Sequence, residues 1–138
     1  KTIEKNIEWY YSLNLLYNTN LIFGIHTVLN VLTTWHFDKL SNWMSSDINT
    51  KNFNQKSIDL VRYPKYLNLA YMPANLKDLY IDKIKNMQLS NEGKKRIIDH
   101  ILSEESNNEF WKEFLIKMKS LDKFTKKDLT KIIPAEMY

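Results

Sequence analysis

The sequence predicts an α/β protein that is mostly helical, with about two parallel strands at its centre. An apolar run at residues 21–31 has the length and composition of a buried strand, and a second short run follows at residues 57–63. A helical pattern lies between the two runs. The 138-residue chain holds two Gly and three Pro, which favours helices over a many-turned all-β fold. This length usually forms one domain.

The first expected element is an amphipathic helix over residues 2–13, which ends near a turn at Asn18 and Asn20. The strand at 21–31 follows. One of its faces consists of Leu21, Phe23, Ile25, Thr27 and Leu29, and the other of Ile22, Gly24, His26, Val28 and Asn30. Because both faces begin apolar, we expect other layers to cover both of them, as in a parallel sheet.

A helix is expected next, capped by Thr33 or Thr34 and carrying an apolar stripe through Trp35, Leu40 and Trp43. Residues 45–55 are polar and resemble a loop. The second strand follows at 57–63. Strand, helix and strand within some 40 residues fit a crossover that joins parallel neighbours.

The second half of the chain predicts helices only. Pro73 suits the first turn of a helix that runs to Met87, and Ser90 suits the cap of the next one. A further helix is expected over 107–121, and a last short one from Thr125 that Pro134 stops. Two parallel strands make a marginal sheet on their own. We therefore expect the chain to belong to a larger α/β protein, or to pair with another copy.

Composition excludes several classes of function. The net charge of +4 is mild and both signs are interleaved, so we do not expect nucleic acid as a partner. Cysteine is absent, which excludes disulfides and thiolate metal sites, and the three His lack the spacing of a zinc site. No membrane span or secretory signal is evident, which predicts a cytoplasmic protein without a membrane partner. A chain that begins with Lys inside a helical pattern is expected to be a piece of a longer protein.

Two segments together resemble the carboxy-terminal region of radical S-adenosylmethionine (SAM) proteins. They are "HTVLNVLTTWHFDKLSNWM" at 26–44 and "SIDLVRYPKYLNLAYMPANLKDLYIDKI" at 57–84. The most similar group is the twitch-domain-containing one that is common in phage and marine sequences. The resemblance rests on the order and spacing of Thr27, Val28, Asn30, Trp43, Pro64, Tyr66, Leu67, Met72, Pro73, Leu76, Lys77, Leu121 and Asp122. It covers roughly residues 1–125.

The resemblance implies a partial β/α barrel in residues 1–70 and a helical carboxy-terminal cap in 71–138. Such a region forms the wall and cap of a ligand cavity. Radical SAM enzymes hold an iron–sulfur cluster on three cysteines, and this chain has none. The resemblance implies that the parent protein binds S-adenosylmethionine and the cluster, and that this chain alone can bind neither of them. We expect this chain to carry no catalytic residue. The expected partner is the remainder of the parent, or a second copy.

Ligands of parallel β/α folds sit at the carboxyl ends of the strands, which makes His26, Asn30 and Arg62 the candidate cofactor-binding residues. His26 and Asn30 share one face of the first strand and suit hydrogen bonds to a nucleoside or substrate. Alternatively, His26 is a satisfied core histidine and Asn30 caps the following turn. Arg62 suits a bidentate clamp on a carboxylate or phosphate. Its alternative is an ion pair with Asp59 or Asp38.

Two other functions stay open. The first is a helical interaction module, phage-encoded and self-associating, with Tyr10, Trp35 and Trp111 in its contact patch. The second is weak nucleic-acid binding through the basic residues 94–96 and 125–131, which we rank last because the basic stripe is sparse.

Overall fold

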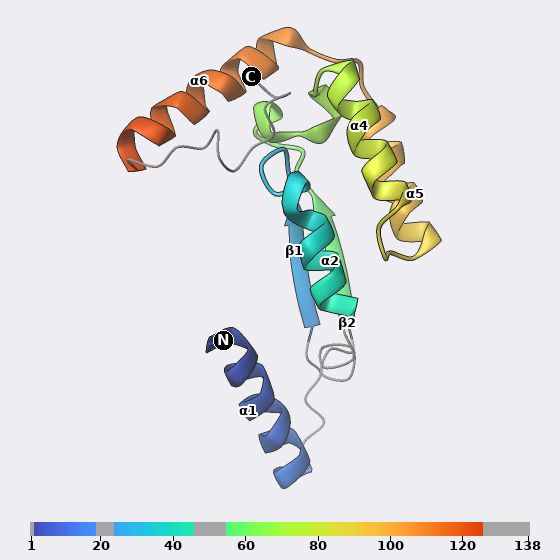
Figure 1. Ribbon diagram of the computed structural model, residues 1–138, viewed down its shortest axis with the longest axis vertical. Coiled ribbons are helices and arrows are strands. Elements are labelled where there is room, and N and C mark those ends of the chain that lie inside the picture. The colour runs from blue at the N-terminus through green and yellow to red at the C-terminus, as the bar shows by residue number, and fades with distance from the viewer. Residues whose placement is uncertain (1, 19–23, 46–54, 126–138) are drawn as a thin grey trace.

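The computed structural model describes residues 2–18, 24–45 and 55–125, and its ribbon is drawn in Figure 1. These residues are mostly helical and contain two parallel strands, which confirms the coarse fold class predicted from the sequence. The elements are α1 (Thr2–Tyr17), β1 (Gly24–Leu29), the 3₁₀ helix η1 (Thr34–His36), α2 (Phe37–Ser45), β2 (Gln55–Leu60), the 3₁₀ helices η2 (Lys65–Leu67) and η3 (Leu69–Tyr71), α4 (Ala74–Lys85), α5 (Asn91–Leu102) and α6 (Asn108–Thr125).

The sheet of the described residues has the order β1–β2, with Gly24 opposite Gln55 and Leu29 opposite Leu60. Helix α2 forms the connection between the strands, as the spacing of the apolar runs predicts. Strand β1 ends at Leu29, two residues before the end of the expected strand 21–31, and residues 21–23 of that range lie outside the described residues. Strand β2 begins two residues before the expected start and ends at Leu60, after which the Val61 amide still donates to the Leu29 carbonyl at 3.0 Å.

Only one face of the strand pair is covered within the described part of the chain. Thr27 and Leu29 are buried on the face that α2 covers, where the Thr27 hydroxyl lies 3.9 Å from the Met44 sulfur. On the other face Val28 is 46% exposed and His26 is also exposed. The expectation that both faces are covered is therefore wrong for these residues. The reason is the partner strand, whose residues on this face are polar and need no burial.

The core lies between α2, α4, α5 and α6 at the carboxyl end of the strands. Its fully buried side chains are Leu29, Val31, Phe37, Leu69, Met72, Leu76, Tyr80, Ile84, Ile97, Ile101 and Phe114. Trp111 stacks on Phe114 with ring centroids 4.8 Å apart. Residues from both sides of position 70 contribute to this single cluster, and their burial is the main favourable contribution to folding.

Turn and cap residues match the sequence in part. Asn18 has a positive φ of 48° at the end of α1, as suits the predicted turn. Ser90 caps α5, and its hydroxyl accepts from the Gly93 amide at 3.1 Å. Of the two candidate caps, Thr33 stands at the N-cap position of η1, but its hydroxyl accepts from the Asn30 amide and donates to the Val28 carbonyl in place of capping the helix. The Thr34 hydroxyl donates to the Asn30 carbonyl. The helix expected after Thr125 lies outside the described residues.

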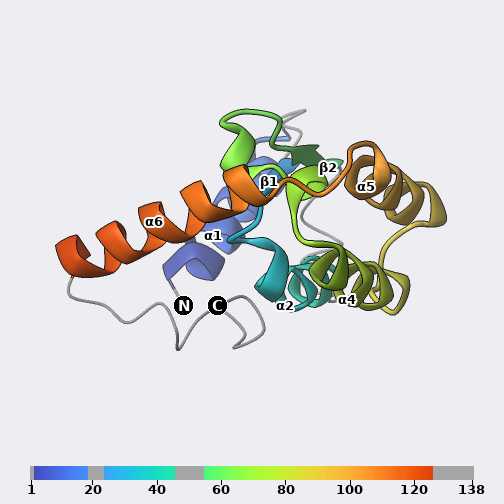
Figure 2. The same cartoon turned by 90° about the horizontal axis from the view of Figure 1, so that it is seen from above.

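The helices are distributed unevenly around the strands. In Figures 1 and 2, α2 and α4 lie on one side of the sheet, and α5 runs beside the outer edge of β2. Helix α6 lies beyond the carboxyl ends of the strands, where the Asn107 amide donates to the Tyr71 carbonyl at 3.2 Å. Helix α1 lies beyond the amino ends, and the Trp43 indole donates to Glu4 at 3.4 Å. No helix of the described residues has the length and apolar character to cross a lipid bilayer.

Candidate functional site

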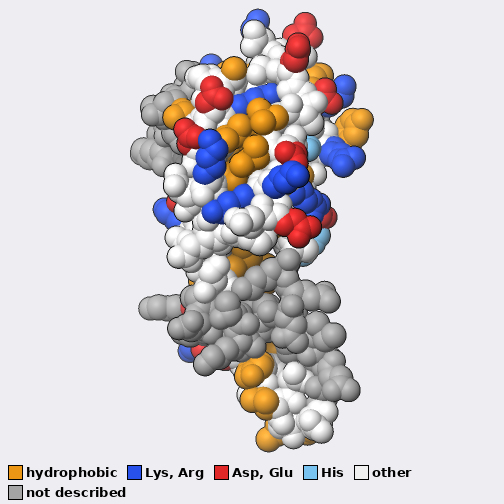
Figure 3. All heavy atoms as spheres, turned by 90° about the vertical axis from the view of Figure 1, so that its right-hand side faces the viewer, with side chains coloured by type: hydrophobic (Ala, Val, Ile, Leu, Met, Phe, Trp, Pro, Cys, Tyr) orange, Lys and Arg blue, Asp and Glu red, His pale blue; other side chains and the backbone are white. Residues whose placement is uncertain are grey.

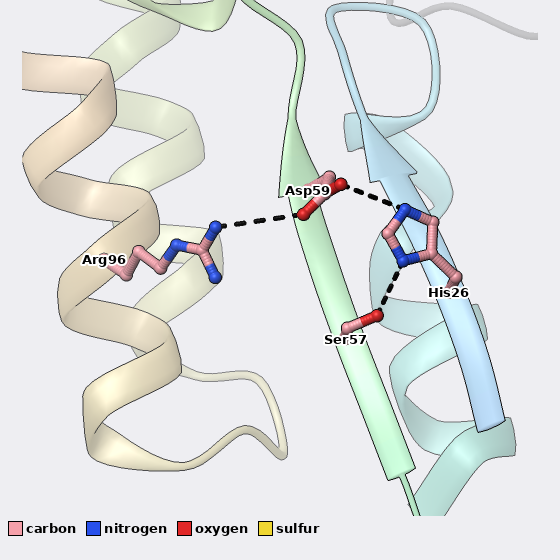
Figure 4. Close-up of polar contacts among 4 residues, drawn as sticks. All are labelled: His26, Ser57, Asp59 and Arg96. Atoms are coloured by element: carbon pink, nitrogen blue, oxygen red, sulfur yellow. Dashed lines mark hydrogen bonds and ion pairs between the residues drawn. The ribbon is translucent and has the colours of Figure 1, made fainter.

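The uncovered face of the sheet carries a network of polar side chains, drawn in Figure 4. His26 on β1 lies between two residues of β2: its Nδ1 is 2.7 Å from the Ser57 hydroxyl and its Nε2 is 3.0 Å from the Asp59 carboxylate. The parallel register produces this contact, because it places His26 opposite Ser57 and Asp59 opposite Val28. Arg96 of α5 reaches the other oxygen of Asp59 at 3.9 Å. The network therefore links both strands to α5.

The network has the Ser–His–Asp connectivity of an acid–base relay. Hydrolases of that type also need preorganised oxyanion donors and a site from which water is excluded. Here the His26 and Asp59 side chains are 56% and 58% exposed, so water reaches both groups. Exposed ion pairs contribute little to stability. The arrangement suits hydrogen bonding to a ligand or partner that covers this face.

Asn30 does not join this network. Its Oδ1 accepts from the amides of Leu32 at 2.8 Å and Thr33 at 3.2 Å, so the side chain closes the turn that leaves β1. Its carbonyl accepts from the Thr34 amide at 3.0 Å. These contacts agree with the alternative interpretation of the sequence, in which Asn30 caps the turn after the first strand. His26, by contrast, is exposed and is not a core histidine.

Arg62 lies two residues beyond the end of β2 and is exposed. Its two suggested acidic partners are engaged elsewhere, since Asp38 pairs with Lys83 at 3.2 Å and Asp59 contacts His26 and Arg96. The side chain lines two adjoining cavities, of about 360 Å³ and about 520 Å³. Of the three predicted residues, Arg62 therefore lines a cleft, His26 lies on the open sheet face, and Asn30 belongs to a turn.

The cleft also contains a histidine, His100, that is not among the candidate site residues predicted from the sequence. His100 of α5 lines both cavities beside Arg62, and its Nε2 is buried without a hydrogen-bond partner among the described residues. Burial lowers the pKa of His100 below its ordinary value of 6.5, and Arg62 and Arg96 lower the pKa further. The available sequence signal was the spacing of Arg96 and His100, one helical turn apart, but nothing local places Arg62 beside them.

The surface around this cleft is mixed in charge. Figure 3 shows Lys and Arg side chains interleaved with Asp and Glu over the part of the molecule that carries α4 and α5, as the sequence predicts. Among the described residues no three His, Asp or Glu side chains gather closely enough to hold a metal ion. The chain has no cysteine and so supplies no ligand of the kind that an iron–sulfur cluster requires.

Comparison with known proteins gives no match: no protein-family model, no curated protein and no solved structure is significantly similar to this chain.

Proposed function

We propose that this chain is the carboxy-terminal part of a radical SAM-like enzyme, in which it forms one wall of the ligand cavity and a helical cap. The observation that supports this best is the asymmetry of the sheet. Helix α2 covers one face, whereas the other presents His26, Ser57 and Asp59 to solvent. In a β/α barrel the helices lie outside and the opposite face of each strand points inward. The polar face is the inner wall in this proposal.

The two edges of the sheet support the same arrangement. Helix α5 flanks the outer edge of β2. Strand β1 pairs only with β2 among the described residues, and two-stranded sheets are marginal in water. A largely apolar groove of about 550 Å³ follows β1 and is lined by Ile25, Leu32 and Phe37 among others. Further strands of the parent would therefore add beside β1, which makes β2 the last strand of the sheet.

This chain supplies no part of the cluster chemistry. Radical generation from S-adenosylmethionine belongs to the absent cluster-binding region, and the residues present would bind and orient a ligand. On the wall, His26 is bonded to Ser57 and Asp59 through its two ring nitrogens, so the three residues would meet a ligand as one network. Arg62 offers a guanidinium near the carboxyl end of β2.

The reading frame upstream of Lys1 tests the proposal. It should encode further strand–helix units and a Cys-x-x-x-Cys-x-x-Cys motif, and the longer protein, purified without oxygen, should show iron–sulfur absorbance. Hydrogen exchange gives a second readout: amides of β1 should exchange more slowly in the longer protein than in the 138-residue chain, while those of α5 stay unchanged. A frame without the cysteine motif, or equal exchange of β1 in both proteins, would refute the proposal.

A second candidate function, self-association as a helical interaction module, is favoured by α1. None of the side chains of residues 4–17 is fully buried, and Trp9, Leu15, Leu16 and Tyr17 are exposed. Exposed apolar surface of this kind marks interaction sites. The contact patch suggested from the sequence is partly wrong, because Trp35 is buried and Trp111 packs against the core.

Sedimentation velocity separates the two candidates. A compact oligomer of the 138-residue chain that dissociates in Leu16→Glu would support the module, since Leu16 is 74% exposed on α1. The matched control is Leu79→Glu, which places the same charge at an exposed position of α4. A monomer at all concentrations, or equal dissociation in both variants, would exclude self-association through α1.

A further inference from the structure

The cleft between the carboxyl end of β2 and the last turns of α5 is made entirely of residues in this chain. One of its two cavities, of about 360 Å³, is lined by Arg62 and Lys65 from the segment after β2, and by His100, Ser103 and Glu104 from the end of α5. A second cavity of about 520 Å³ adjoins it through Arg62 and His100, and adds Arg96. The site does not depend on completion of the sheet.

One cationic group of this cavity, the Lys65 ammonium, lies beside two aromatic rings. The Lys65 ammonium lies 5.2 Å from the Phe110 ring centroid and 5.9 Å from that of Tyr71, within the range of cation–π attraction. The backbone that carries Arg62 is tied down, since its carbonyl accepts from the Asn68 amide group at 3.5 Å. His100 adds a buried Nε2 that has no hydrogen-bond partner among the described residues.

The acidic groups nearby leave Arg62 without a partner. Glu104 lines the same cavity, but its carboxylate acts on the neighbouring Lys77 ammonium, which also donates to the Glu104 backbone carbonyl at 2.6 Å. Asp59 contacts Arg96. Asp99 lines only the adjoining cavity. No ion pair joins Arg62 to an acidic side chain of the described residues. The repulsion between Arg62, Arg96 and a protonated His100 would be relieved by an anion.

We propose that the Arg62–His100 cleft binds the phosphate group of a small phosphorylated ligand. Arg62 and Lys65 line the cavity from the segment after β2 and His100 lines it from α5, and a tetrahedral dianion can accept from three such donors at once. A carboxylate carries one negative charge on two coplanar oxygens, whereas a phosphate dianion carries up to two charges on three oxygens and so balances the positive charges of Arg62 and Lys65 more fully. The Tyr63 ring, 77% exposed at the rim, gives the rest of the ligand an aromatic surface.

Nuclear magnetic resonance of the histidine side chains tests the site with inorganic phosphate as the probe. At constant ionic strength, phosphate should shift the His100 resonances to saturation, and acetate should not. The pKa of His100 should rise on binding, because the dianion stabilises the positively charged imidazolium. The negative charge offsets the repulsion from Arg62, Arg96 and Lys65, and it reinforces the attraction from Asp59, Asp99 and Glu104. A His100→Gln variant identifies the resonances.

Two variants decide whether the response belongs to the cleft. Arg62→Gln should weaken phosphate binding about tenfold or more, as loss of a charge-assisted contact does. Lys117→Gln removes an exposed charge of α6 outside the cleft and should leave the affinity unchanged. Lys65→Gln repeats the test if Arg62→Gln fails to fold. A shift that does not saturate, or that the Arg62 and Lys117 variants weaken equally, would overturn the proposal.

Discussion

Replacement of Asn30 by Ala tests whether this residue holds the turn after β1. The side-chain oxygen accepts from the amides of Leu32 at 2.8 Å and Thr33 at 3.2 Å. A hydrogen bond contributes about 0.5–1.5 kcal/mol net, and Ala provides no acceptor for either amide. The Leu32 amide is partly buried, so water replaces its partner less readily than that of Thr33. We expect Asn30→Ala to lower the free energy of unfolding by about 1–3 kcal/mol.

Urea denaturation followed by circular dichroism measures this loss. With a slope of about 2 kcal/mol per molar urea, the midpoint should fall by about 0.5–1.5 M without a change of slope. Asn30→Asp keeps an oxygen acceptor at the same place and should lose less than about 0.5 kcal/mol. Asn75→Ala, at an exposed position of α4, is the matched control and should stay within about 0.5 kcal/mol of the parent protein. If Ala and Asp destabilise equally, the acceptor is not what holds the turn.

Three further predictions concern buried polar groups. Tyr80→Phe should change thermal stability by no more than about 1 kcal/mol, because Thr34 is the one side chain among the described residues that its buried hydroxyl meets; a larger loss would show that this hydroxyl makes a strong hydrogen bond. Lys77 is 6% exposed and donates to the Glu104 carbonyl, so in urea Lys77→Ala should lose about 2–4 kcal/mol and Lys77→Met clearly less, since Met preserves the buried stem. The lowered pKa of His100 means that the unfolded chain takes up its proton first, so stability should be fully present above pH 6.5 and fall as the pH drops below it. His100→Gln should flatten that slope, which thermal melts between pH 7.5 and 5 would check.

The carboxyl-end rule for parallel strands predicts Arg62 as a ligand-binding residue, and in the structure Arg62 lines a cleft. It could not assign the roles of His26 and Asn30. Asn30 follows the last residue of β1, and whether its side chain points to a ligand or to its own turn depends on the path of the next three residues. His26 faces outward because its neighbours across the register are polar, and the register is a property of the assembled pair of strands.

What the sequence determined by itself was local. Apolar spacing predicted the helices, Ser90 predicted the start of α5, and the spacing of two apolar runs around a helical pattern predicted a parallel pair. These features depend on residues within a few turns of one another. The tertiary structure alone decided which face of the sheet stays open and which side chains meet across it. His26 and Ser57 are 31 residues apart in the chain, and Arg62 meets His100 only because α5 packs beside β2. Such contacts follow from strand register and helix packing, which no local pattern encodes.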